Sequence, residues 1–203
     1  MAAPITHVAL TDKVYKKHFS DKDKGEFYVG TSLPDIRYLG VVERDKTHFK
    51  NLSLKDVVNN NSFDAGLMFH SLVDEVREQF MRRNNYYSLF PKSELQTQAS
   101  KVLEDRVLYN RLDNWSDIIS YFEKVYRSEI DLGIKSSDVK RWHQLLQEYF
   151  TNKPEDKDTV AFTTGMGFGQ ERAREIINVI KSSDTERAKM IVLDFYNNFE
   201  SLI

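Results

Sequence analysis

The stretch AGLMFHSLVDE (residues 65–75) places two polar side chains inside an apolar segment. Apolar residues around it recur at steps of three and four, which predicts a long helix from about Phe63 to Arg82. On such a helix His70 and Asp74 stand one turn apart on the same face. A buried carboxylate is costly unless it is paired or holds a cation. The stretch therefore predicts that a compensating group lies close to Asp74.

The same spacing of apolar residues recurs along most of the chain and predicts an all-α fold. The 203 residues contain only 8 glycines and 4 prolines, and no segment alternates convincingly in the way that a strand does. We expect a single-domain multi-helix bundle of roughly eight to ten helices over residues 1–203. Its metal-site half would cover about residues 1–90, and residues 91–203 would complete the core with further helices.

Start and stop signals locate the individual helices. Residues 116–130 and 139–150 each outline one apolar helical face. In the first part of the chain we expect a helix from about Ile5 to Phe19, a second that begins near Glu26, and a short one with Pro34 in its first turn. Ser53 would cap a short helix that ends at Asn59, and further helices would follow from Ser93 onward. Two helices would close the chain, with Ser182, Ser183 and Asp184 between them.

Three polar or glycine-rich segments are expected to connect helices. GIKSSD (133–138) and NKPEDKD (152–158) have the composition of exposed turns. The segment AFTTGMGFGQ (161–170) has the glycines of a loop that could cradle a phosphate. Neither the Lys-Ser/Thr pair of a P-loop nor a preceding strand accompanies it, so we interpret it as a flexible turn between two helices.

Composition limits the classes of function. The formal net charge is −2, with 29 basic and 31 acidic side chains, which is unlike a protein that binds duplex nucleic acid. The chain has no cysteine, which excludes disulfides and thiolate metal sites. We find neither a signal-peptide core nor the ~18 consecutive apolar residues that a membrane helix requires. We therefore expect a cytoplasmic protein without a transmembrane segment, and nothing in the sequence indicates a protein partner.

Five possible metal ligands occur within the first 80 residues: His7, Asp35, His48, His70 and Asp74. Imidazoles and carboxylates are the usual ligands of zinc, and also of manganese or iron, when thiolates are absent. Each residue alone has a more ordinary interpretation, such as a hydrogen-bonded core histidine or an aspartate at a helix N-terminus. Spacing alone leaves these interpretations open.

Two neighbours on the long helix add to this pattern. Gly66 lies one turn before His70, where the missing side chain would leave room for an ion or its water. Arg77 lies about one turn beyond Asp74. We consider it a catalytic candidate, because it would either neutralise Asp74 or hold an anionic substrate.

The order of these motifs resembles the zinc-dependent phospholipase C family, in particular its small bacterial members of unassigned substrate. The resemblance lies in His7, FYVGTSLPD (27–35), DKTHF (45–49) and AGLMFHSLVDE (65–75), and it covers roughly residues 6–80. Single-strand-specific nucleases share the all-helical fold of this family. The resemblance therefore implies a fold similar to that of the phospholipases and nucleases.

The resemblance also implies a metal centre and a reaction. Asp35, His48, His70 and Asp74 would bind the main ion, and His7 would bind a second ion, with Asp74 able to bridge the two. The reaction would be hydrolysis of a small phosphorylated substrate, a phosphodiester or a phospholipid-like ester. Metal-bound water would be the nucleophile. Asp35 would steer or deprotonate that water.

The sequence departs from the family pattern at the ligands of a third ion. Phe80 occupies the position six residues after Asp74, and His143 is followed by Gln147 rather than by a carboxylate. We therefore expect one well-held zinc ion, with a weaker second ion at His7. Two alternatives remain open at this point. The chain could be a non-catalytic metal-binding helical module for a ligand or protein partner, or the polar residues could form a network without an ion.

Overall fold

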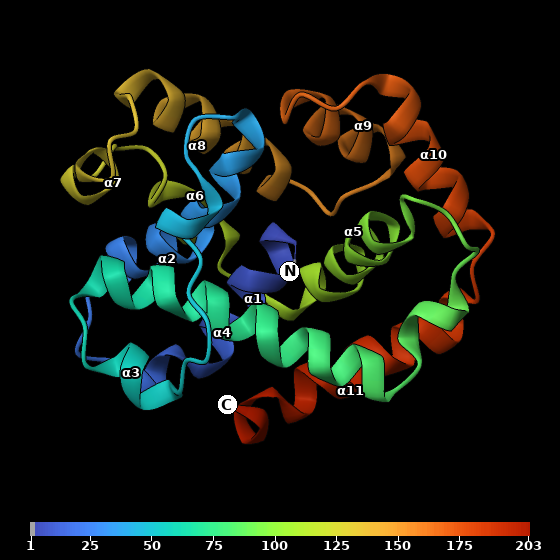
Figure 1. Cartoon of the computed structure of the whole chain (residues 1–203), viewed down its shortest axis with the longest axis horizontal. Helices are drawn as coiled ribbons and strands as arrows, with labels where there is room; N and C mark the ends of the chain where they lie inside the picture. The colour runs from blue at the N-terminus through green and yellow to red at the C-terminus, as the bar shows by residue number, and fades with distance from the viewer. Residues whose placement is uncertain (1–2) are drawn as a thin grey trace.

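Helices form all the regular secondary structure in the computed structural model, which describes residues 3–203 (Figure 1). The described residues contain no strand, so the predicted all-α class is confirmed. The α-helices are α1 (Pro4–His18), α2 (Lys24–Ser32), α3 (Leu54–Val58), α4 (Ser62–Arg83), α5 (Gln96–Leu108), α6 (Trp115–Ser120), α7 (Arg127–Asp131), α8 (Ser136–Phe150), α9 (Asp156–Gly165), α10 (Gln170–Lys181) and α11 (Thr185–Leu202). The 3₁₀ helices are η1 (Leu33–Leu39), η2 (Arg44–Lys46), η3 (Tyr86–Leu89) and η4 (Tyr109–Arg111).

Helix α4 crosses the middle of the molecule, and α2 packs closely against it (Figure 1). Two glycines make this close approach possible. A Cβ atom on Gly66 of α4 would lie 2.2 Å from the carbonyl oxygen of Phe27, and one on Gly30 of α2 would lie 2.3 Å from the carbonyl oxygen of Phe63. The missing side chain of Gly66 therefore makes room for the backbone of α2. Our expectation that it makes room for an ion was wrong.

Helix α4 also contacts α1, α3 and α11. Helices α1, α5 and α11 pack against one another and enclose one continuous apolar core with α2 and α4. Helices α6, α7 and α8 lie at the upper left of Figure 1 and α9 and α10 at the upper right, and α8 contacts α9. In the part of the chain that the structure describes, no helix is both long and apolar enough to cross a membrane.

Local capping explains where several predicted helices begin. The side chain of Ser53 accepts a hydrogen bond from the Asp56 N–H at 3.4 Å, and the Asp56 carboxylate accepts one from the Ser53 N–H at 2.9 Å. The Asp184 carboxylate accepts a hydrogen bond from Arg187 N–H at the start of α11. Ser53 and Asp184 thus act as the predicted N-caps.

Residues 116–130 differ from the prediction, because they form α6 and α7 with a turn between them. The reason is a buried carboxylate. Glu129 is fully buried, accepts a hydrogen bond from Tyr126 N–H at 2.8 Å, and lies 2.8 Å from Nε2 of His143 in α8. This tertiary contact turns Glu129 inward and starts a new helix at Arg127. The same contact engages Nε2 of His143, so His143 has a structural role.

The predicted connections are only partly irregular. Helix α8 already begins at Ser136 and α9 at Asp156, so the ends of both polar segments are helical. The first half of the glycine-rich segment, residues 161–165, belongs to α9. The predicted turn between α9 and α10 is confined to residues 166–169, where Gly167 adopts φ 92°. Helix α5 begins at Gln96, three residues later than Ser93.

Candidate metal centre

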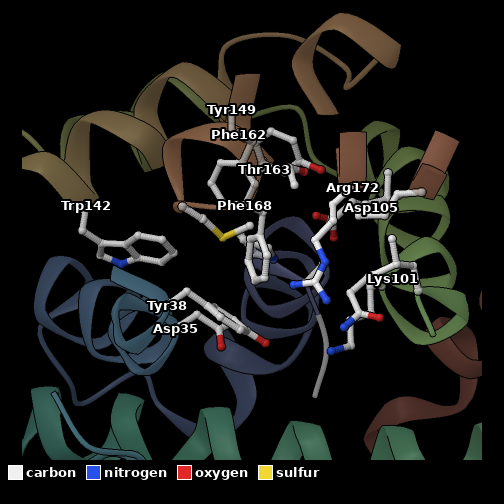
Figure 2. A pocket seen from close by; sticks show the side chains of 17 residues that line it. Asp35, Tyr38, Lys101, Asp105, Trp142, Tyr149, Phe162, Thr163, Phe168 and Arg172 are labelled. Carbon is white, nitrogen blue, oxygen red and sulfur yellow. The ribbon is translucent and has the colours of Figure 1, made fainter. Parts of the chain in front are cut away.

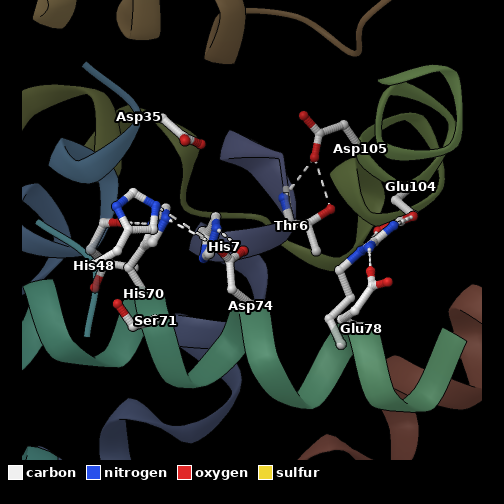
Figure 3. Close-up of polar contacts among 12 residues, drawn as sticks. Thr6, His7, Asp35, His48, His70, Ser71, Asp74, Glu78, Glu104 and Asp105 are labelled. Carbon is white, nitrogen blue, oxygen red and sulfur yellow. Dashed lines mark hydrogen bonds and ion pairs between the residues drawn. The ribbon is translucent and has the colours of Figure 1, made fainter. Parts of the chain in front are cut away.

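The five predicted ligands converge although they come from four separate segments. Helix α4 supplies His70 and Asp74, α1 supplies His7, and η1 supplies Asp35, while His48 follows η2. Figure 3 shows the three imidazoles and Asp74 gathered above α4, with Asp35 directed toward the same region. All but His48 are buried as whole residues, and the His48 side chain is only 5% exposed. This arrangement requires a physical explanation, because buried polar groups need partners.

The close approach of α2 and α4 sets the orientation of His70. Its Nδ1 lies 2.9 Å from the carbonyl oxygen of Thr31 in α2. A carbonyl oxygen only accepts hydrogen bonds, so Nδ1 carries the proton and donates. With the proton on Nδ1, the ring can offer the lone pair of Nε2 to a cation, and this Nε2 has no hydrogen-bond partner among the described residues. A backbone carbonyl that fixes the tautomer in this way is typical of metal-bound histidines.

His48 is oriented in the same manner by its neighbour. Its Nδ1 lies 3.0 Å from the hydroxyl oxygen of Thr47, and that hydroxyl lies 3.4 Å from the carbonyl oxygen of Arg44. The Thr47 hydroxyl donates to the carbonyl and accepts from Nδ1, which leaves the lone pair of His48 on Nε2. Burial and the neighbouring His70 lower the pKa of His48 to about 3. His48 is therefore neutral at pH 7 and able to bind a cation.

His7 completes the imidazole group. Its ring stacks on that of His70, with 3.8 Å between the centroids. Burial, followed by the charge of His70, lowers the pKa of His7 to about 3, although Asp74 acts in the opposite direction. Nδ1 of His7 has no hydrogen-bond partner among residues 3–203. His7 is thus a second neutral, buried base.

Asp74 stands between the three imidazoles. Its Oδ2 lies 3.6 Å from Nε2 of His70 and 4.0 Å from Nε2 of His48, while its Oδ1 lies 3.4 Å from Nε2 of His7. Burial by itself would raise the pKa of Asp74, but His70 and His7 bring it well below 3.8. The two oxygens of one ionised carboxylate therefore face two different sets of histidines.

Two overlapping groups of three residues can each hold a metal ion. In the first group, ligand atoms of His7, His70 and Asp74 all lie within 4.8 Å of one another, and in the second those of Asp35, His48 and His70 do. Nδ1 of His70 is engaged by α2, so only its Nε2 remains and it can bind one ion. The imidazoles supply nitrogen donors and the two carboxylates match the charge of a divalent cation, so these residues fit a metal of the zinc, manganese or iron type.

Arg77 has a different role from the one predicted. Its side chain is 0% exposed. Its guanidinium donates to Glu104 through Nε and Nη2 and to Glu78 and Tyr87 through Nη1. Figure 3 shows Glu104 and Glu78 at the end of the view opposite to the histidines. Arg77 therefore joins α4 to α5, and our prediction that it neutralises Asp74 or holds a substrate was wrong.

A cleft of about 710 Å³ opens beside the cluster, and Asp35 is the cluster residue that lines it. Its walls are mainly apolar and include Trp142, Phe162 and Phe168, while its polar groups converge from η1, α5 and α10 (Figure 2). Asp35 therefore belongs both to the buried ligand cluster and to the lining of this cleft.

Three polar residues on the far side of this cleft were not predicted from the sequence, and they are Lys101 and Asp105 of α5 and Arg172 of α10. Asp105 is 0% exposed, and its Oδ1 accepts hydrogen bonds of 2.8 Å from both N–H and Oγ1 of Thr6. Burial raises the pKa of Asp105 to about 7, although the Thr6 bonds act against it. Only the one-turn spacing of Lys101 and Asp105 on a predicted helix could have drawn attention to them.

Comparisons with models of protein families, with curated proteins and with solved structures found no match for this chain. What the coordinates define is an all-α protein with a buried histidine–aspartate cluster that can hold a metal ion.

Proposed function

We propose that this protein is a metal-dependent hydrolase of phosphoric esters, with a zinc, manganese or iron ion at the histidine–aspartate cluster. The observation that carries the proposal is the buried cluster itself, in which Nε2 of His70 and Nε2 of His48 are directed toward Asp74 without a hydrogen-bond partner among the described residues. Leaving such groups buried and unsatisfied would cost about 1–3 kcal/mol each. A bound cation would offset that cost.

The order of motifs that resembles the zinc-dependent phospholipase C family supports the same proposal. The proposed main site consists of Asp35, His48, His70 and Asp74, with His7 at a weaker second site. Asp74 suits a bridging role, because its Oδ2 faces His70 and His48 while its Oδ1 faces His7. One ion is favoured over two, because both candidate groups require His70.

A bound divalent ion would supply Lewis acidity toward phosphoryl oxygens and would lower the pKa of a coordinated water. The residues of the chain perform the remaining tasks. Asp35 lies at the border between the cluster and the cleft, and its Oδ1 has no hydrogen-bond partner among residues 3–203. It is therefore the group best situated to orient the attacking water and to accept its proton. The apolar walls of the cleft would bind the organic group of the ester and exclude bulk water.

The experiment combines metal analysis with an activity assay on the full chain. Purified protein should contain a transition metal in stoichiometric amount, and it should hydrolyse bis(p-nitrophenyl) phosphate. A chelator should abolish turnover, and added Zn²⁺ or Mn²⁺ should restore it. The variants His70→Ala and His48→Gln should lose the metal and at least about 100-fold of the activity. His18→Ala is the matched control, since His18 lies at the C-terminal end of α1, outside the cluster.

Two outcomes would contradict the proposal. A protein that contains only trace metal, and whose unfolding temperature is unaffected by added Zn²⁺, would have a hydrogen-bonded network in place of a metal centre. A protein that holds one ion but does not hydrolyse phosphomonoesters, phosphodiesters or phospholipids would be a non-catalytic metal-binding module.

A further inference from the structure

Two cationic side chains enter the cleft from the side opposite to Asp35. Lys101 comes from α5 and Arg172 from α10, whereas Asp35 and Tyr38 come from η1 (Figure 2). Lys101 and Arg172 are 71 positions apart in the chain, yet they line the same space. Convergent polar groups in a mainly apolar cleft are characteristic of a binding site.

The carboxylates of Asp35, Asp74 and Glu104 act on Lys101 and partly offset the lowering of its pKa by burial, but none of them contacts its ammonium group directly. Among the residues that the structure describes, Lys101 and Arg172 form no ion pair and no hydrogen bond through their side chains, and Arg172 has only its contact with the Phe168 ring at 5.8 Å. Arg172 is exposed to solvent, whereas the buried guanidinium of Arg77 is paired with Glu104. Lys101 is half-buried, and burial lowers its pKa. An anion in the cleft would compensate this unfavourable burial.

The surroundings of the two cations indicate what the anion is attached to. Phe168 lies beside Arg172, and the aromatic rings of Tyr149 and Phe162 stack with 4.2 Å between their centroids on the wall of the cleft. Trp142 and Ile176 extend the apolar wall. A small inorganic anion would leave this surface uncovered, whereas an anion with an apolar group attached would bury it.

We propose that Lys101 and Arg172 form an anion-binding subsite, at which they contact the phosphoryl oxygens of an ester whose apolar organic group lies against Phe168 and the neighbouring aromatic wall. The identity of the ligand as a phosphoric ester rests on the proposed function. The subsite itself rests on the two cations and the apolar cleft. In the complete site the phosphoryl group lies between the cluster on the Asp35 side and the two cations on the other.

Calorimetric titration of the full chain with (1-naphthylmethyl)phosphonate tests the subsite, because this probe has no hydrolysable ester bond. The titration is performed with Zn²⁺ present and again after chelation. In both conditions Lys101→Met and Arg172→Met should each weaken binding about tenfold, and Lys101→Arg should restore most of it. Arg174→Met is the matched control on α10, since Arg174 is exposed and does not line the cleft, and it should change binding less than twofold.

A second probe, 1-naphthylmethanol, separates the anion from the apolar group. It should bind more weakly than the phosphonate and with the same affinity in all variants. Equal binding of both probes, or phosphonate binding that is insensitive to Lys101→Met and Arg172→Met in folded variants, would overturn the subsite. If the protein shows no metal-dependent hydrolysis but its phosphonate binding depends on Lys101, the hydrolase proposal is wrong and the subsite stands. The failure of one proposal can therefore be distinguished from the failure of the other.

Discussion

The buried carboxyl of Asp105 allows a quantitative prediction about stability. Its pKa is about 7 in the folded protein, against 3.8 for an ordinary aspartate, and burial is the main cause. The folded state therefore holds the proton more tightly than the unfolded state does. The stability associated with this group is complete below pH 3.8 and is lost as the pH rises toward 7. One pH unit of difference in pKa corresponds to about 1.4 kcal/mol, so the whole loss is about 4 kcal/mol.

The substitution Asp105→Asn should remove this dependence. The Asn Oδ1 can keep both hydrogen bonds from Thr6, and the amide imitates the protonated carboxyl without titrating. Between pH 5 and pH 8 we expect the free energy of unfolding of the unaltered protein to fall by about 2–3 kcal/mol relative to that of Asp105→Asn. With a urea m-value of about 2 kcal/mol/M, the difference between their unfolding midpoints would change by about 1 M.

Urea unfolding followed by circular dichroism at the two pH values provides the measurement. Asp113→Asn is a suitable control, since Asp113 is an exposed aspartate. If the difference in unfolding midpoint between the unaltered protein and Asp105→Asn is the same at pH 5 and pH 8, then Asp105 does not hold a proton in the folded state. That result would refute the reasoning from burial.

Three further predictions concern packing and the ligand cluster. Gly66→Ala should lower the free energy of unfolding by at least about 2 kcal/mol and weaken metal binding, because its Cβ atom would meet a carbonyl oxygen of α2 at 2.2 Å. An unchanged unfolding temperature would contradict this prediction. Glu104→Gln should lower the free energy of unfolding, measured with urea, by about 3–5 kcal/mol, because the charge of Arg77 would stay buried without its ionised partner. A decrease below about 1 kcal/mol would show that this ion pair contributes little to stability. The metal-free protein should lose stability as the pH falls from 6.5 toward 3, because His7 and His48, with pKa values of about 3, bind protons more readily when unfolded. His48→Gln should reduce that loss, and identical acid unfolding curves for the two proteins would show that His48 makes no contribution.

The sequence was sufficient to predict the helical class and most helices of the first half of the chain. Helix α4 was predicted as residues 63–82 and occupies Ser62–Arg83, because its apolar positions keep one strict period over six turns. Local caps such as Ser53 were predictable for the same reason: the groups involved are three residues apart, and no distant contact is required.

The candidate ligands His7, Asp35, His48, His70 and Asp74 were also found from the sequence, as residue types in a particular order. Their convergence was not contained in that order. It depends on the close approach of α2 and α4 at Gly30 and Gly66, and on the Thr31 carbonyl that selects the tautomer of His70.

Other features were decided only by the tertiary structure. The break between α6 and α7 depends on Glu129 meeting His143, and the role of Arg77 depends on Glu104 across the α4–α5 contact. The cleft and its two cations combine residues from six helices, which are α1, η1, α5, α8, α9 and α10. A one-dimensional pattern reports which face of a helix is apolar, but the neighbour on that face is selected by the packing of the whole chain, and the neighbour determines whether a buried charge is paired, proton-bound or available to a ligand.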